Sequence, residues 1–253
     1  MREWWGLARS LVIYWRPGRQ RGLRRLYRPF IRPGDLAFDV GAHLGDRAVA
    51  FRSLGARVVA LEPQRRLFSL LGRIAGRDAG IMLRREAVGA APGRAELAVS
   101  SRTPTVSTLA RAWREGVADR NPGFSRVRWD RTEEVAVTTL DRLIGEFGVP
   151  RFVKLDVEGH EAEALAGLTV PVESLSFEFV SGGLEVAGAC IRRLGGLADY
   201  EYNAVEGESR TFLFEAWKEP DAMIRWLERA APRLSSGDIY ARRRECAGRP
   251  CGA

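Results

Sequence analysis

The sequence predicts an α/β protein built on a doubly wound, mostly parallel β-sheet. Short apolar runs of strand type alternate with helical patterns from residue 36 to residue 195, which is typical of parallel strands joined by helices. The first run, 36–41, ends at a glycine turn and passes directly into a helical pattern, so the backbone there can approach a nucleotide-like ligand. Two strand patterns after residue 199 predict an antiparallel hairpin at the C-terminal end of the sheet.

The composition excludes several classes of protein. Hydrophobic residues make up 45% and charged residues 28% of the 253 residues, as in ordinary globular proteins. The three cysteines, Cys190, Cys246 and Cys251, form no CxxC pair and no cluster with histidine, which argues against a disulfide framework and structural zinc. A reducing compartment is therefore expected, and we predict a cytoplasmic protein.

The net charge of +8 is unevenly distributed. Residues 1–35 hold nine arginines against two acidic residues, whereas the remaining 218 residues contribute only +1. The basic balance belongs to an N-terminal arm and does not indicate a surface for specific nucleic acid binding. We predict three parts: a basic, aromatic arm over 1–33, a domain over 34–243 and a disordered tail over 244–253.

The arm contains two segments of different character. Residues 3–15 are apolar and aromatic, too short to span a bilayer and without a signal-peptide cleavage site. They predict an amphipathic helix that docks on the domain or on a membrane surface, because tryptophans at both ends and flanking arginines suit that interface. Membrane docking would place the protein at the inner face of the membrane. Residues 16–28 predict an arginine-rich linker or helix in which Leu26 and Tyr27 are available for packing.

The first half of the domain begins after the turn Pro33-Gly34-Asp35. The expected elements are a strand at 36–41, a helix at 47–54, a strand at 57–61, a helix at 64–75 and a strand at 81–88. A turn at Pro92-Gly93 precedes another strand pattern at 95–100, so 84–100 is expected to form a hairpin.

The polar stretch 101–132 predicts a long loop or lid with a short helix at 107–115, and loops of this length inside a domain are usually functional. The alternation then resumes. The expected elements are a strand at 135–138, a helix at 140–147, a strand at 152–157, a helix at 160–167, a strand at 174–180, a helix at 184–195, hairpin strands at 200–205 and 211–215, a helix at 221–230 and a strand at 239–242.

Glycines and carboxylates follow the strands at the edge where ligands bind in such sheets. Gly41 and Gly45 can adopt positive φ and leave room for a ligand, and Asp46 can cap the next helix with its carboxylate. Glu62 ends the second strand, 23 residues after Asp39. A carboxylate in that position can accept hydrogen bonds from both hydroxyls of a ribose.

The charge of the first turn discriminates between two kinds of adenosine ligand. A dinucleotide site requires a third glycine to hold a pyrophosphate, and Asp39 and Asp46 would repel that group. An NAD-type oxidoreductase is therefore disfavoured. The two carboxylates suit a ligand with an ammonium and a sulfonium group, which is S-adenosylmethionine.

Five motifs resemble those of the FkbM family of S-adenosylmethionine-dependent methyltransferases. They are Phe-Asp-Val-Gly-Ala-His-Leu-Gly-Asp at 38–46, Leu-Glu-Pro at 61–63, Ala-Val-Gly at 87–89 followed by Gly93, Thr-Thr-Leu-Asp at 138–141 and Val-Lys-Leu-Asp-Val-Glu-Gly-His-Glu at 153–161. The resemblance covers about residues 34–180. It implies a class I methyltransferase fold and O-methylation of hydroxyls, typically on sugars or polyketide-like natural products. His43 stands where many members of that family carry Asn.

The resemblance and the strand-end positions together imply a site for S-adenosylmethionine. Its expected residues follow the first three strands and the strand at 152–157. They are Asp39, Gly41, Ala42, His43, Gly45, Asp46, Glu62, Pro63, Glu86, Ala87 and Asp156.

The candidate catalytic residues come from the second half of the domain. Strand alternation puts Lys154, Asp156 and Glu158 on one side, and in the class I fold this strand end lies beside the transferred methyl group. A hydroxyl that attacks a sulfonium must lose its proton late in the reaction, and His160 and Asp156 are the candidate bases. Lys154 can hold a carboxylate ionised, and Glu178 completes the set. These residues either act chemically or only orient the loops and the cofactor.

We therefore predict an S-adenosylmethionine-dependent O-methyltransferase that acts on a hydroxyl of a sugar, glycolipid or natural-product acceptor. The alternative is a catalytically inactive methyltransferase fold that serves as a binding module at a membrane surface, which the N-terminal arm motivates. Acidic groups at the ligand edge also offer oxygen ligands for Mg²⁺, and metal dependence is left open. Acceptor choice is expected to depend on 101–132 and on the C-terminal region.

Overall fold

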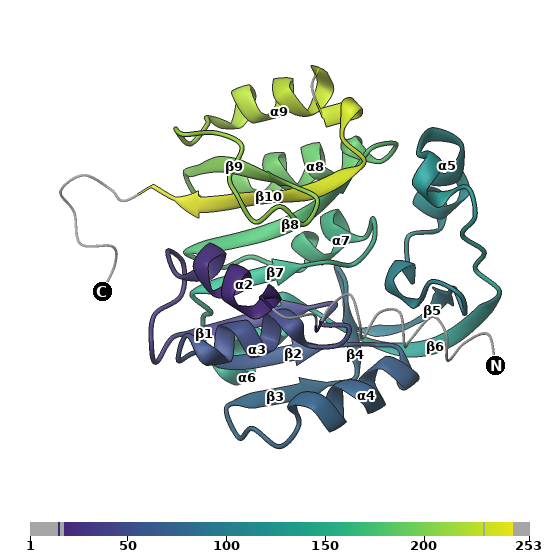
Figure 1. Ribbon diagram of the computed structural model, residues 1–253, viewed down its shortest axis with the longest axis vertical. Coiled ribbons are helices and arrows are strands. Elements are labelled where there is room, and N and C mark those ends of the chain that lie inside the picture. The colour runs from purple at the N-terminus through teal and green to yellow at the C-terminus, as the bar shows by residue number, and fades with distance from the viewer. Residues whose placement is uncertain (1–14, 16–17, 230, 245–253) are drawn as a thin grey trace.

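The centre of the protein is a seven-stranded sheet with the order β3-β2-β1-β7-β8-β10-β9 (Figure 1). The computed structural model describes residue 15, residues 18–229 and residues 231–244. The strands of this sheet are β1 (Leu36–Val40), β2 (Arg57–Leu61), β3 (Ile81–Arg84), β7 (Phe152–Leu155), β8 (Ser174–Val180), β9 (Tyr200–Glu206) and β10 (Ser236–Arg243). Strand β10 runs antiparallel to both of its neighbours, whereas β1, β2, β3, β7 and β8 are parallel. This is the strand order of the class I methyltransferase fold, so the predicted fold class is confirmed.

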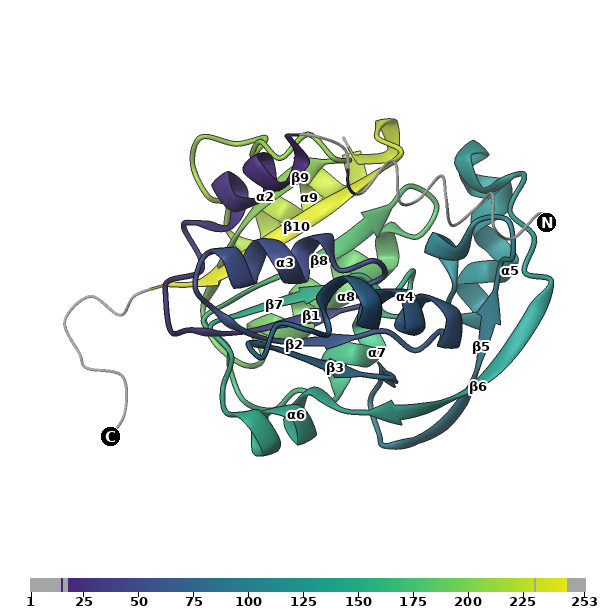
Figure 2. The same cartoon turned by 60° about the horizontal axis from the view of Figure 1, so that its bottom comes forward.

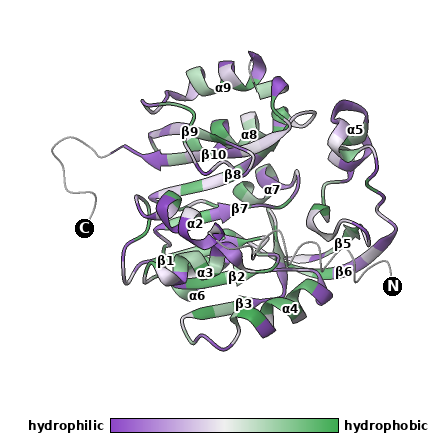
Figure 3. Ribbon diagram, in the orientation of Figure 1, coloured by the Kyte–Doolittle hydropathy of each residue, from purple (hydrophilic) through white to green (hydrophobic). Residues whose placement is uncertain are grey.

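Helices cover both faces of the sheet, as Figures 1 and 2 show. One face packs against α2 (Arg19–Tyr27), α3 (Asp46–Ser53) and α4 (Arg65–Ala75). The opposite face packs against α6 (Leu140–Phe147), α7 (Glu161–Ala166), α8 (Leu184–Gly195) and α9 (Pro220–Arg229). The strands are therefore buried on both sides, which explains their nearly continuous apolar sequence (Figure 3).

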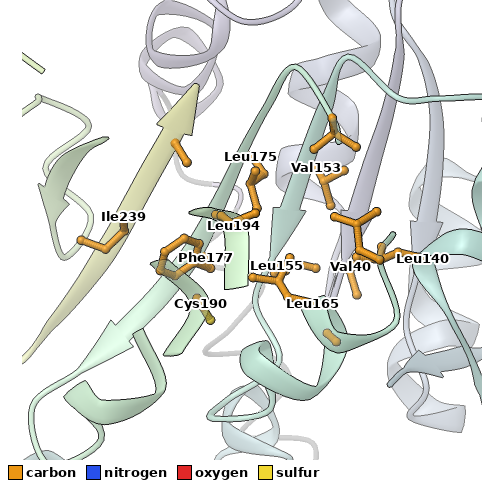
Figure 4. Packing of buried hydrophobic residues seen from close by; sticks show 14 of the residues in the cluster. Val40, Leu140, Val153, Leu155, Leu165, Leu175, Phe177, Cys190, Leu194 and Ile239 are labelled. Carbon is orange, nitrogen blue, oxygen red and sulfur yellow. The ribbon is translucent and has the colours of Figure 1, made fainter. Parts of the chain in front are cut away.

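The larger hydrophobic core lies between the sheet and helices α6 to α9. Val40, Val153, Leu155 and Phe177 from three adjacent strands meet helix side chains there, as Figure 4 shows. These four side chains are at most 1% exposed. This packing fixes the positions of the strand ends, so the residues that follow β1, β7 and β8 are held on a rigid part of the structure.

A second, three-stranded sheet projects from the ligand edge. Its order is β4-β6-β5, with β4 (Glu86–Val88), β5 (Gly93–Val99) and β6 (Arg131–Thr138). The predicted strand at 81–88 is thus divided between two sheets. The predicted hairpin over 84–100 is wrong, because β6 lies between β4 and β5 and pairs with both.

The predicted lid, 101–132, contains more regular structure than the sequence indicated. Its helix is α5 (Arg111–Arg120), four residues later than the expected start at 107, and two short 3₁₀ turns flank it at Pro104–Val106 and Pro122–Phe124. Trp113 and Val117 of α5 pack with Val180 of β8. The lid is therefore joined to the domain by a small hydrophobic cluster of its own.

The antiparallel C-terminal end of the sheet is confirmed, but its second strand is a different one. Strand β9 pairs with β10 over seven residue pairs. The expected partner, 211–215, contributes only the isolated bridge between Val205 and Phe212. Strand β10 enters between β8 and β9 and brings residues near the C-terminus to the ligand edge.

Part of the predicted arm belongs to the packed structure. Helix α2 buries Leu23, Leu26 and Tyr27, and the ring of Tyr27 lies edge-on to Phe51 of α3 at 4.7 Å between centroids. Nearly all of the predicted amphipathic segment 3–15 and of the predicted tail 244–253 lies outside the described residues. The boundary between an arm over 1–33 and a domain over 34–243 stays a prediction.

Among the helices that the structure describes, none combines the length and the apolar character needed to cross a membrane.

Candidate functional site

The candidate site lies at the carboxyl ends of β1 and β7, where the strand order reverses. Gly41, directly after β1, has a φ of 82°, and a Cβ atom there would overlap the carbonyl oxygen of Asp156, which follows β7. The N–H of Asp156 donates to the carbonyl of Val40 at 3.0 Å. A glycine is required at position 41 by both its backbone conformation and this close approach.

A cavity opens at this edge, and we call it the strand-end cavity. Most of the predicted site residues line it: Gly41, Ala42, His43, Glu62, Pro63, Glu86, Ala87, Asp156, His160 and Glu178. Four predicted residues are not part of its lining: Asp39, Gly45, Asp46 and Lys154. The sequence therefore located the cavity but did not separate its lining from the residues behind it.

Glu62, at the end of the β2 segment, is held by the turn that follows β1. Its Oε2 accepts a hydrogen bond from the N–H of His43 at 3.0 Å, and its Oε1 accepts one from the N–H of Gln64 at 2.9 Å. Glu62 is only 3% exposed, and burial raises its pKa to about 7. Each oxygen keeps a lone pair, so the carboxylate can still accept from two neighbouring hydroxyls of a ligand.

His43 adopts a backbone conformation that most side chains avoid. Its φ is 50°, in the left-handed region where Asn, Asp and His are enriched among non-glycine residues. This conformation directs its N–H toward Glu62. Burial lowers the pKa of His43 to about 4, so the imidazole is neutral at physiological pH.

Asp39 is a buried carboxylate inside β1. It is 1% exposed, and neither of its oxygens accepts a hydrogen bond from any residue that the structure describes. Burial raises the pKa of Asp39 to about 7, against the opposing effect of Arg47. A buried carboxylate without a partner costs free energy, and a cationic ligand group nearby would offset that cost.

Gly45 and Asp46 serve the loop rather than the cavity. Gly45 is the N-cap of α3 with a φ of 76°, and a Cβ atom there would collide with Leu71 of α4. Asp46 is the first residue of α3, and its Oδ2 accepts from Nε of Arg19 at 2.6 Å. The predicted helix cap by Asp46 is therefore wrong, because α2 packs on α3 and brings a buried arginine to this carboxylate.

Lys154 is fully buried behind the cavity. Its Nζ lies 2.9 Å from Oδ1 of Asp238 in β10 and 3.3 Å from Oδ2 of Asp156. Burial opposes the charge of Lys154, but the two carboxylates outweigh burial and raise its pKa. Burial likewise favours neutral Asp156, yet Lys154 and Arg47 hold the pKa of Asp156 below its usual range. Asp156 is thus an ionised carboxylate that suits a cationic partner better than proton transfer.

Three carboxylates meet at the far end of the cavity. Oxygens of Asp156, Glu158 and Glu178 all lie within 4.8 Å of one another. Burial raises the pKa of Glu158 well above its usual value, and the nearby charge of Asp156 adds to the effect. Burial, together with the nearby charge of Glu158, also raises the pKa of Glu178 well above its usual value. Groups arranged in this way keep a proton between them or attract a cation.

The loop after β7 is held in a strained conformation. Glu158 has a φ of 54°, which for a non-glycine residue costs on the order of 1 kcal/mol. The buried carboxylate of Glu161 accepts from the N–H groups of Val157 at 3.0 Å and Gly159 at 3.3 Å. The hydroxyl of Thr108 donates to the carbonyl of Glu158 at 2.6 Å. These three hydrogen bonds maintain the conformation that turns Glu158 into the cavity.

His160 lines the cavity as a half-buried imidazole. Its Nδ1 lies 3.8 Å from a carboxylate oxygen of Glu163. Burial lowers the pKa of His160, so the ring is neutral at pH 7 and the contact with Glu163 is not an ion pair there. A neutral imidazole in a ligand cavity can accept a proton.

The lid closes one side of the cavity. Thr105, Ser107 and Leu109 belong to the cavity lining. The indole of Trp113 fills the space beside Gly159 and Gly183, where a Cβ atom on either glycine would overlap it. The lid and the loop after β7 are therefore in direct contact.

Three charged residues of the cavity were missed by the sequence reasoning. They are Arg47 in the first turn of α3, Glu208 after β9 and Asp238 in β10. Arg47 lies 3.3 Å from Oε1 of Glu208 and 3.5 Å from Oδ1 of Asp46. The position of Arg47 directly after the glycine turn could have identified it as a site residue from the sequence. Glu208 and Asp238 reach the site only because β10 inserts between β8 and β9, which no local pattern announces.

These residues fit S-adenosylmethionine as a ligand. The buried, unpaired carboxylate of Asp39 and the ionised Asp156 match a cationic group, whereas the missing side chain of Gly41 makes room for the backbone of Asp156. Glu62 matches a ribose diol. Arg47 is the one cationic side chain among the described residues that line the cavity, and it matches a carboxylate.

Comparisons with known proteins identify relatives of this chain. Hexuronic acid methyltransferase AglP of Haloferax volcanii is 29% identical over 178 residues, which are 68% of this chain and 67% of that protein. Two solved structures are each 10% identical with a TM-score of 0.45. Precorrin-6y C5,15-methyltransferase from Geobacter metallireducens covers 89% of this chain and 88% of its own. The Aeropyrum pernix fibrillarin in complex with S-adenosyl-L-methionine covers 84% and 68%.

A family model gives the broadest sequence match. The model of the methyltransferase FkbM domain matches residues 39–234, which is most of the chain. The match contains Asp39, Glu62, Asp156 and Glu178, the carboxylates of the candidate site that follow or lie within four different strands. The chain therefore belongs to the FkbM family of methyltransferases.

Proposed function

We propose that this protein transfers a methyl group from S-adenosylmethionine to a hydroxyl of a sugar, glycolipid or natural-product acceptor. The observation that carries the proposal is Glu62, a buried carboxylate that two backbone N–H groups hold at the end of β2, opposite the glycine turn after β1. A carboxylate in that position recognises the ribose of an adenosine ligand. The sugar-acting relative from Haloferax volcanii supports the acceptor class.

In this proposal, Glu62 would hold the ribose of the cofactor in the strand-end cavity. Ala87 and Leu97, which are apolar cavity residues, would contact the adenine. Asp156, with Asp39 behind it, would hold the ammonium group, and Arg47 would hold the carboxylate of the methionine part. The bound cofactor supplies an electrophilic methyl group on its sulfonium.

The acceptor end of the cavity is then the region of Glu158, Glu178 and His160. The structure favours a division of roles among the predicted bases. Asp156 has a lowered pKa and holds a cation, whereas the neutral ring of His160 suits proton removal from a hydroxyl. Glu178, whose pKa is raised, can accept a proton only in its ionised form. Lys154 acts through Asp156 and is a positioning residue, since it does not reach the cavity.

The three carboxylates also match the oxygen donors that Mg²⁺ prefers. The chain alone does not require the metal, because the raised pKa of Glu158 and Glu178 allows a shared proton to do the same electrostatic work. Methyl transfer measured after treatment with EDTA distinguishes the two arrangements. Loss of activity that Mg²⁺ restores supports the metal, and unchanged activity excludes it.

Calorimetry with S-adenosylhomocysteine tests the cofactor site. Substitution Glu62→Ala should weaken binding by about 10- to 100-fold, because it removes the carboxylate that accepts hydrogen bonds from two ligand hydroxyls. Glu115→Gln, on the exposed side of the lid helix, is the matched control and should leave affinity unchanged. Absence of binding by the unaltered protein, or equal affinity in Glu62→Ala, would overturn the proposal.

A separate experiment identifies the acceptor atom that receives the methyl group. Incubation with cofactor that carries a labelled methyl group and a panel of neutral sugars, uronic acids and glycolipids should give a labelled product. An ether survives mild alkali and supports transfer to a hydroxyl. A label that alkali releases shows transfer to a carboxylate instead.

A further inference from the structure

A second cavity adjoins the strand-end cavity, and Pro63 lines both. It is open to solvent and measures about 670 Å³. We call it the arginine cavity, because its lining contains Arg65, Arg66, Arg85, Arg94 and Arg131, together with Thr132, Glu133 and Glu134. None of these residues has a place in the proposed methyl transfer.

The two neighbouring cavities have opposite charge. Five guanidinium groups face two carboxylates in the arginine cavity, which leaves a net charge of +3. The strand-end cavity instead combines seven carboxylates with Arg47. Since residues 36–253 together carry only +1, the +3 of the arginine cavity is a local excess of positive charge. An anion is attracted to it and is repelled from the strand-end cavity.

Two of the arginines have no acidic partner in the described chain. Arg94 pairs with Glu134 at 2.9 Å, and Arg131 pairs with Glu133 at 3.2 Å. Arg65 and Arg85 are exposed, and their guanidinium groups form no ion pair with any described residue. Their planar forks of donors match the oxygen geometry of a phosphate group.

The arrangement is electrostatically unfavourable for the protein by itself. Arg65 and Arg66 begin α4, and the first turn of that helix contains no acidic residue of its own; Oε2 of Glu133 in β6 accepts from the N–H of Arg65 at 3.1 Å. Cations at a helix N-terminus oppose the helix dipole. Arg85 follows β3, Arg94 lies in β5 and Arg131 begins β6, so four separate segments add like charge at this place. A bound anion would relieve this repulsion.

We propose that the arginine cavity is a binding site for a phosphate group, carried either by a soluble phosphorylated compound or by a lipid headgroup. Both sources offer the same tetrahedral oxyanion to the guanidinium groups. The site is separate from the proposed methyl-transfer cavity, although the two share the wall at Pro63.

Titration calorimetry with inorganic pyrophosphate at constant ionic strength tests the proposal. The variant Arg65→Ala/Arg85→Ala removes the two arginines without an acidic partner and leaves no carboxylate unpaired. It should bind pyrophosphate at least 10-fold more weakly than the unaltered protein. The control Arg225→Ala/Arg229→Ala removes two exposed arginines from α9 and should bind as the unaltered protein does. No binding by the unaltered protein, or an equal loss in both variants, would overturn the proposal.

Flotation with vesicles identifies the source of the phosphate. Binding to phosphatidylglycerol vesicles but not to phosphatidylcholine vesicles, lost in Arg65→Ala/Arg85→Ala, supports a lipid headgroup. Pyrophosphate binding without flotation supports a soluble ligand. Affinity for S-adenosylhomocysteine, measured on the same samples, should be equal in all variants. Failure of that ligand to bind would refute the proposed methyl transfer and leave the phosphate result intact.

Discussion

Burial determines the charge state of the strand-end carboxylates one residue at a time. Asp39, Glu62 and Glu161 each have a pKa raised to about 7, chiefly by burial. Asp156 lies beside them but has a lowered pKa, because Lys154 and Arg47 outweigh its burial. At neutral pH the site therefore holds partly protonated carboxylates next to an ionised one. The sequence placed these carboxylates at one edge but contained no information on which of them keep a proton.

Glu62→Gln should separate ligand affinity from stability. The native pKa of Glu62 is raised above its unfolded value, so its favourable effect on stability is present at low pH and is lost as the pH rises through 7. Gln has one acceptor oxygen, so the variant also loses one of the two backbone hydrogen bonds at every pH. The stability of the variant relative to the unaltered protein should therefore be lowest at pH 5 and should rise by about 1 kcal/mol or more at pH 8. Its affinity for S-adenosylhomocysteine should rise less steeply between pH 6 and 8. Urea denaturation and calorimetry measure the two effects, and equal destabilisation at both pH values would contradict the argument.

His43 tests whether backbone conformation or the imidazole matters at that position. Asn tolerates positive φ, so His43→Asn should keep the N–H directed at Glu62 and change ligand affinity by less than about threefold. His43→Val places a β-branched residue at a φ of 50° and should lower stability by about 1–3 kcal/mol. Thermal unfolding and calorimetry on the pair decide the matter. A large loss of affinity in His43→Asn would show that the ring itself contacts the ligand.

At the scale of elements, Trp113 connects the lid to the loop after β7. The sequence predicted a lid over 101–132, yet the contact that fixes it depends on two glycines far away in the sequence, Gly159 and Gly183. Thr108 adds a hydrogen bond to the same loop. The position of the lid is therefore set by packing between segments, which local patterning does not contain.

Trp113→Ala should release the lid without unfolding the domain. Loss of the indole from its cluster costs about 3 kcal/mol of local packing, and the hydrophobic cores on the two faces of the sheet do not include it. Limited proteolysis within 101–132 should accelerate at least 10-fold, and the acceptor KM should rise more than the dissociation constant for S-adenosylhomocysteine. Arg111→Ala, exposed on the same helix, is the control. An unchanged cleavage rate would show that other contacts hold the lid.

At the scale of the whole molecule, a buried ionic contact joins two parts of the sheet that are distant in the sequence. Lys154 of β7 reaches Asp238 of β10, 84 residues later in the chain, as well as Asp156 at the cavity. The contact exists because β10 runs antiparallel beside β8, which places Asp238 opposite Glu178. The C-terminal strand thereby supports the ion pair that keeps Asp156 charged.

Lys154→Met should be strongly destabilising. It leaves the buried Asp238 and the partly buried Asp156 without their cation, at a cost of about 3 kcal/mol. Adding Asp238→Asn should recover part of the stability, because one of the orphaned charges is then neutral. The double variant should still bind S-adenosylhomocysteine more weakly than the unaltered protein, since Asp156 has lost the lysine that lowers its pKa. Chemical denaturation and calorimetry measure both effects, and a fully additive loss in the double variant would contradict the coupling.

The sequence by itself determined the fold class, the glycine turn, the end of the second strand and the family. These features depend on local patterns: apolar periodicity, glycine positions and carboxylates that directly follow strands. The tertiary structure alone decided the roles that depend on neighbours. Strand β6 lies between β4 and β5, and Arg19 donates a hydrogen bond to Asp46. Asp238 and Glu208 line the cavity because the strands follow the order β8-β10-β9. Strand pairing between distant segments and the burial of charge are properties of the packed molecule, and no short stretch of sequence encodes them.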